Sequence, residues 1–127
     1  MKRIALVVLA GALLLATVAG VAVAKTFVCD TIPCYGTKKK DMIGERNGSV
    51  HDRIYARAGD DTVIASRAGN DEDVVFGGKG DDKINVQDGD GRDRACGGPG
   101  NHDTIILDSG DKFSFDGCNP SDFTTQP

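Results

Sequence analysis

The most regular feature of the chain is an apolar residue placed two positions after an aspartate, at steps of 8 to 12 residues. The pairs are Asp41/Ile43, Asp52/Ile54, Asp61/Val63, Asp73/Val75, Asp82/Ile84, Asp93/Ala95, Asp103/Ile105 and Asp111/Phe113. The short apolar pieces in which they lie are bounded by Gly or Asp, which is typical of short β-strands. A repeated unit of about nine residues predicts an all-β solenoid whose parallel strands stack from coil to coil.

The aspartates of these pairs alternate along the chain between two series. Asp41, Asp61, Asp82 and Asp103 are separated by 20, 21 and 21 residues, and the turns before the last three keep Gly where a positive φ is needed. If a coil contains two strands, these four residues share one edge, which we name the regular edge. The opposite edge has longer and less even turns, and we name it the irregular edge. Its aspartates are Asp52, Asp73 (or Asp71), Asp93 and Asp111.

The apolar member of each pair is expected to point into the solenoid. Val63, Val75, Ile84 and Ile105 are therefore predicted to form the core stripe, with Ala95 as its one small member.

The N-terminus has the features of an export signal. Met1-Lys2-Arg3 precedes an apolar run from Ile4 to Ala24, and the small residues at its end favour cleavage before Lys25. The run is also long enough to span a bilayer, so an uncleaved anchor is the alternative. We predict a signal peptide over 1–24, a single repeat domain over 25–118 and a disordered polar tail over 119–127.

Charge restricts the partners. Without Lys2 and Arg3 the chain has 13 basic and 19 acidic residues, a net charge near −6. That balance disfavours nucleic acid and anionic membranes as partners. We expect an extracellular, secreted protein.

The four cysteines of an exported chain indicate two disulfides, for which three pairings exist. We favour Cys29–Cys34, which tightens the entry around Pro33, and Cys96–Cys118, which ties a strand to the end of the last coil. Both bonds would cap the ends of the solenoid, where strands are half covered.

Residues 77–85 read Gly-Gly-Lys-Gly-Asp-Asp-Lys-Ile-Asn, a full match to the nonapeptide G-G-x-G-x-D-x-U-x, in which U is a large apolar residue. The first six residues form a turn whose carbonyls and Asp can hold Ca²⁺, and the last three form a short strand. The segments 56–64 and 97–106 match in part. Aspartates stacked in neighbouring coils repel one another without a cation, which independently favours calcium.

At these residues the chain resembles the hemolysin-type (RTX) calcium-binding repeat family, and in particular its small exported members. The resemblance implies a parallel β-roll with Ca²⁺ between the Asp61 and Asp82 turns and between the Asp82 and Asp103 turns. The ligands it implies are the carboxylates of Asp61, Asp82 and Asp103 and the turn backbones of Gly59, Gly77, Gly78, Gly80, Gly97, Gly98 and Gly100.

Two departures weaken parts of this site. Ala56 and Arg57 stand at the two leading Gly positions of the Asp61 turn, and His102 is an extra residue before Asp103. The irregular edge is expected to bind calcium poorly or not at all.

The function predicted is a secreted, non-enzymatic calcium-binding repeat protein in which the ion is structural. His51 and His102 each precede an Asp, but no catalytic motif accompanies them. The alternative is a calcium-independent, disulfide-stabilised solenoid that serves as an extracellular adhesion module. Folding that depends on Ca²⁺ would separate the two.

Overall fold

The computed structural model describes residues 25–46, 51–67, 69–100, 102–115, 118 and 123–127, and the signal segment predicted over 1–24 lies outside them. Their strands are β1 (Lys25–Val28), β2 (Cys34–Tyr35), β3 (Asp41–Gly44), β4 (Arg53–Ala58), β5 (Thr62–Ile64), β6 (Val74–Lys79), β7 (Lys83–Asn85), β8 (Arg94–Cys96), β9 (Thr104–Ile106), β10 (Lys112–Ser114) and β11 (Thr124–Thr125). These described ranges contain no helix, and none therefore that could cross a membrane.

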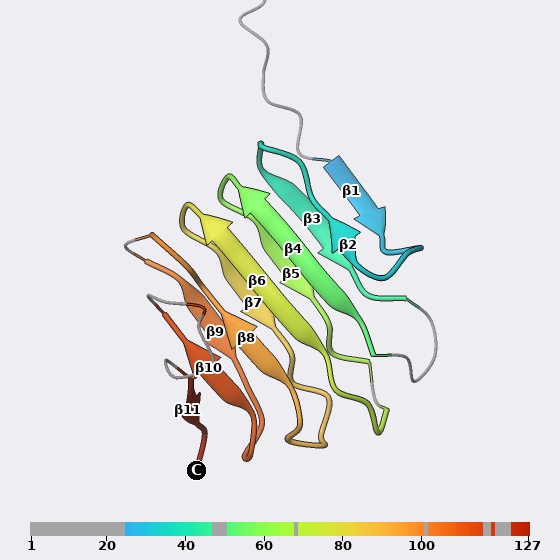
Figure 1. Ribbon diagram of the computed structural model, residues 1–127, viewed down its shortest axis with the longest axis vertical. Helices are drawn as coiled ribbons and strands as arrows, with labels where there is room; N and C mark the ends of the chain where they lie inside the picture. Colours follow the sequence, from blue (N-terminus) through green and yellow to red (C-terminus); the bar gives the residue numbers. More distant parts are fainter. Residues whose placement is uncertain (1–24, 47–50, 68, 101, 116–117, 119–122) are drawn as a thin grey trace, which may run out of the picture.

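The strands form two sheets that face each other (Figure 1). One has five strands in the order β1-β3-β5-β7-β9, and the other has six in the order β11-β10-β8-β6-β4-β2. Consecutive strands of the chain alternate between the sheets from β1 to β10. All paired strands are parallel except β10 and β11. This is the predicted β-solenoid, in which each coil adds one strand to each sheet.

The strand register aligns the apolar residues into two columns. In the five-stranded sheet the column is Ile43, Val63, Ile84 and Ile105, and in the six-stranded sheet it is Ile54, Val75, Ala95 and Phe113. All but Ile105 and Phe113 are fully buried, which confirms Val63, Val75, Ile84 and Ala95 as core. Ile105 is only half-buried because β9 is the last strand of its sheet and no further coil covers it.

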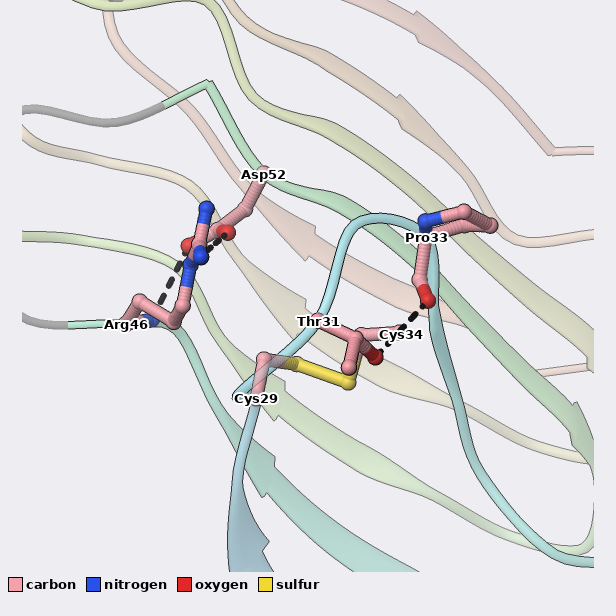
Figure 2. Close-up of a disulfide and its surroundings, with 6 residues drawn as sticks. All are labelled: Cys29, Thr31, Pro33, Cys34, Arg46 and Asp52. Atoms are coloured by element: carbon pink, nitrogen blue, oxygen red, sulfur yellow. Dashed lines mark hydrogen bonds and ion pairs between the residues drawn. A yellow bond between two sulfur atoms is a disulfide. The ribbon is translucent and has the colours of Figure 1, made fainter.

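A disulfide lies near each end of the solenoid. Cys29–Cys34 joins the end of β1 to the start of β2, and Thr31 Oγ1 donates a hydrogen bond to the Pro33 carbonyl within that loop (Figure 2). Cys96–Cys118 ties β8 to the segment after β10. The structure thus contains both favoured pairings.

The C-terminal segment differs from the expected disordered tail. Residues 119–122 lie outside the described part, but β11 pairs antiparallel with β10, and the Gly110 amide donates to the Gln126 carbonyl at 2.8 Å. The two threonines of β11 suit a strand, and β10 would otherwise leave its backbone groups unpaired at the sheet edge. The composition of the tail did not reveal this docking position.

The core column predicts a large difference between two neighbouring isoleucines. Ile84→Ala removes a fully buried side chain and should lower the free energy of unfolding by about 2–5 kcal/mol. Ile64→Ala, at a residue 44% exposed, should lower it by about 1 kcal/mol or less. Urea unfolding followed by circular dichroism measures both, and equal losses would contradict the assigned register.

Candidate metal centres

Both edges of the solenoid are built on a ladder of aspartates. In each ladder the backbone amide of one Asp donates a hydrogen bond to Oδ1 of the Asp one coil further along. On the regular edge the bonds run from Asp41 to Asp61 (2.7 Å), from Asp61 to Asp82 (2.9 Å) and from Asp82 to Asp103 (2.8 Å). On the irregular edge they run from Asp52 to Asp73 (2.8 Å), from Asp73 to Asp93 (2.7 Å) and from Asp93 to Asp111 (3.0 Å).

The ladders explain why an Asp stands at the start of each strand from β3 to β10, or immediately before it. The turn amide has no strand partner at this position, and a short carboxylate from the next coil supplies the acceptor that a buried N–H requires. The ladder includes Asp73 and passes over Asp71, which resolves the ambiguity left by the sequence. The two edges therefore carry equivalent aspartate ladders, although their turns differ in length.

The second oxygens of several ladder aspartates have no partner. Asp61, Asp82 and Asp93 are at most 1% exposed, and Oδ2 of each accepts no hydrogen bond. The end members differ, since Oδ2 of Asp41 accepts from the Thr37 amide and Oδ2 of Asp111 from the Asp108 amide. A buried carboxylate oxygen without a donor or cation is unfavourable. A nearby positive charge would therefore stabilise the ionised side chains of Asp61, Asp82 and Asp93.

On the regular edge, glycine backbones surround these oxygens. A Cβ added at Gly77 would lie 2.3 Å from Asp82 Oδ2 and 2.7 Å from the Gly97 carbonyl oxygen. One added at Gly80 would lie 2.1 Å from the Gly59 carbonyl oxygen. The missing side chains leave carboxylate and carbonyl oxygens facing the same small spaces between coils.

The structure thus brings the predicted regular-edge residues together. Asp61, Asp82 and Asp103 form one ladder, and the turn glycines stack from coil to coil beside them. The carbonyl of Gly78 also faces Gly98, and the carbonyl of Gly80 faces Gly100.

The irregular edge contains groups of converging carboxylates to which the sequence analysis gave little weight. Among the described residues, three groups of carboxylates each place one oxygen per residue within 4.8 Å of the others. They are Glu45, Asp52 and Asp73; Asp71, Asp88 and Asp90; and Asp90, Asp93 and Asp111. All lie on the irregular edge. The sequence analysis did not name Glu45, Asp71, Asp88 or Asp90 as ligands, although the run Asp88-Gly-Asp-Gly was a signal for the last two.

Arginines distinguish the first of these groups from the others. Arg46 Nε lies 3.4 Å from Asp52 Oδ1, as Figure 2 shows, and Arg67 Nε lies 3.7 Å from a Glu45 oxygen. In the described part of the chain, neither group that contains Asp90 has an ion pair with a basic residue. Two guanidinium groups thus supply positive charge at the N-terminal end of this edge, and the two groups further along have none.

Burial dominates the electrostatics of the ladders. It raises the pKa of Asp61 from an ordinary 3.8 to about 7, where the hydrogen bond from the Asp41 amide opposes the shift and the charge of Asp82 adds to it. Burial likewise raises the pKa of Asp82 to about 6 and that of Asp93 to about 8. It also raises the pKa of Glu45, which shares a hydrogen bond with Asp73. Without a cation, the folded protein resists ionisation of these groups.

No protein-family model, curated protein or solved structure matches the chain. The resemblance to hemolysin-type repeats therefore remains an interpretation of the residues. The fold and the site together define the class of protein: a disulfide-containing β-solenoid with buried acidic groups that can hold metal ions.

The raised pKa values predict an unusual dependence of stability on pH. Folded-state pKa values of about 6, 7 and 8 exceed the ordinary 3.8, so the folded state binds protons more tightly than the unfolded chain. The stabilisation is fully present below about pH 4 and is lost as the pH rises through the folded values.

We therefore expect the melting temperature of the metal-free protein to fall steadily from pH 4 to pH 8. Differential scanning calorimetry after removal of metals on a chelating resin measures this. A melting temperature that rises over the same range would show that the buried carboxylates are already compensated.

Proposed function

We propose that this protein is an extracellular, non-enzymatic calcium-binding β-solenoid in which Ca²⁺ is a structural ion. The observation that carries the proposal is the buried Oδ2 atom of Asp82, which has no partner and faces a glycine turn beside a backbone carbonyl. Carboxylate and carbonyl oxygens in a flexible arrangement are the donors that a hard cation such as Ca²⁺ prefers.

On the regular edge, the residues that would hold the ions are Asp61, Asp82 and Asp103 with the carbonyls of the adjoining glycine turns. A cation there would satisfy the unpaired oxygens of Asp61 and Asp82 and remove the repulsion along the ladder. Ion binding and folding would then be coupled, because the unfolded chain has no such site.

The same chemistry extends to the irregular edge. Asp90, Asp93 and Asp111 converge without an arginine, and Asp93 is fully buried with an unpaired oxygen. We include this group as a further calcium position, on the irregular edge. The Glu45 group is excluded because Arg46 and Arg67 already supply its positive charge.

The extracellular location is supported by the two disulfides, which persist in oxidising compartments, and by the N-terminal export pattern. Free calcium outside cells is high enough for sites of modest affinity. The rival function is a calcium-independent adhesion module, in which the ladders act only as a hydrogen-bonded framework.

The decisive experiment adds Ca²⁺ to the metal-free, disulfide-bonded protein at pH 7.5 and follows far-UV circular dichroism and melting temperature, with Mg²⁺ as the comparison. We expect a gain of β-structure or stability that is specific to Ca²⁺. A folded protein indifferent to Ca²⁺ would establish the calcium-independent alternative.

Two substitutions test the edges separately. Asp82→Asn and Asp93→Asn keep an oxygen for the ladder bond but remove a buried charge, so each should stabilise the metal-free protein and reduce the Ca²⁺-induced rise in melting temperature. Asp30→Asn makes the same charge change at an exposed residue and serves as the control. If the three variants respond alike to Ca²⁺, the ion is not held by the ladders.

A further inference from the structure

A groove beside the regular edge is lined by basic residues. It has a volume of about 760 Å³ and is bordered by Lys38, Arg57, Ala58, Gly78, Lys79 and Pro99. Arg57 and Lys79 come from the neighbouring strands β4 and β6, which lie side by side in Figure 1. Gly78 stands directly opposite Arg57 in the strand register, and its missing side chain lets the two backbones approach closely, because an added Cβ would lie 1.8 Å from the Arg57 carbonyl oxygen.

The groove concentrates positive charge on an acidic protein. Three of its lining residues are basic and none is acidic. Within the ranges that the structure describes, Lys38, Arg57 and Lys79 form no ion pair with a carboxylate. The chain as a whole has a net charge of −4, so this local excess is not a consequence of composition.

Arg57 occupies a backbone position that disfavours it. Its φ is +86°, so the expectation that the Asp61 turn keeps Gly wherever a positive φ is needed is wrong at this residue. The residues aligned with it in the next two coils are glycines, Gly78 at +104° and Gly98 at +96°. A side chain at positive φ is unfavourable, and glycine would relieve the strain. Local strain of this kind is often found where function requires a specific side chain.

Aromatic rings fix the guanidinium group of Arg57. Its Cζ lies 4.9 Å from the centre of the Tyr35 ring, a favourable cation–π contact. Tyr35 in turn stacks on Tyr55 at 5.4 Å, and Tyr55 stacks on Phe76 at 4.8 Å. The column of rings thus restricts the side chain of Arg57, a lining residue of the groove, before any ligand binds.

From these features we propose that the groove bounded by Lys38, Arg57 and Lys79 is a binding site for a doubly charged tetrahedral oxyanion, the sulfate or phosphate group of a small molecule or ester. The guanidinium fork can donate two parallel hydrogen bonds to such a group, and the two lysines, one from the coil before and one from the coil after, add point charges. A single carboxylate would leave most of the positive charge uncompensated. The site does not depend on calcium binding.

The test is a titration of the disulfide-bonded protein with sodium sulfate and, separately, sodium phosphate at constant ionic strength, followed by amide NMR shifts. It is run in EGTA and, for sulfate, repeated with Ca²⁺. We expect saturable shifts at residues around the groove. Arg57→Gly should weaken binding by about tenfold or more while leaving the melting temperature unchanged or higher, because it removes both the charge and the strain.

Matched variants separate this site from general attraction. Arg53→Gln removes one charge from the same strand outside the groove and should change the affinity less than twofold, whereas Lys79→Gln should weaken binding without touching the strained position. Glucuronate, with one carboxylate, should bind more weakly than sulfate.

Three results would overturn the proposal: shifts that never saturate, equal losses in Arg53→Gln and Arg57→Gly, or glucuronate binding as tightly as sulfate. If Arg57→Gly unfolds, Lys79→Gln decides between a localised site and none. A sulfated monosaccharide compared with inorganic sulfate then shows whether the free ion or its ester is the better ligand.

Discussion

The backbone-to-carboxylate hydrogen bond between successive coils is the interaction on which this fold depends. Among the residues that the structure describes, the two aspartate ladders contain six such bonds, three on each edge, at donor–acceptor distances between 2.7 and 3.0 Å. Short strands leave many turn amides without a strand partner, and a solenoid must satisfy them as it grows. Aspartate does this with a side chain short enough to reach only the next coil. The ladder therefore reinforces the parallel strand pairing that spaces the coils and keeps the apolar columns in register.

The aspartate ladder also has an electrostatic cost. A carboxylate has two oxygens, and the ladder uses only one of them at Asp61, Asp82 and Asp93. Each is buried beside other carboxylates, and its pKa is raised accordingly. Three forms of compensation are open to such a group: a proton, a guanidinium or a metal ion. Arg46 beside Asp52 is an instance of the second, at the N-terminal end of the irregular edge.

The distribution of the remaining charge gives the molecule distinct surfaces. Acidic groups line the edges, where the turns are. Basic residues stand at the border of the six-stranded sheet, where Arg57 adopts a positive-φ backbone conformation that is unfavourable for it but not for the glycines aligned with it in the next coils. A repeat sequence under selection for stability alone would favour glycine at that position, as the next two coils have it. Arg57, where the chain departs from the repeat, is thus the most informative residue outside the ladders.

The sequence by itself determined the solenoid, its core and its two disulfides. The spacing of Asp and apolar residues was sufficient because each coil has the same local pattern. Equivalent positions of successive coils pair with each other, so the local spacing also predicts which strands pair. Ile84 is buried because it follows Asp82 by two positions in an interior coil, whereas Ile105, placed in the same way after Asp103, is half-buried in the last strand of its sheet. The paired cysteines followed from their places at the ends of the repeat.

Only the tertiary structure decided which carboxylates meet. Glu45 joins Asp52 and Asp73, and Asp71 joins Asp88 and Asp90, across irregular turns whose paths do not follow the repeat. The docking of β11 onto β10 likewise joins segments that no periodicity relates. The physical reason is the same in each case. A periodic sequence predicts the contacts that recur from coil to coil, whereas these contacts lie where the chain departs from the period and depend on how whole turns pack.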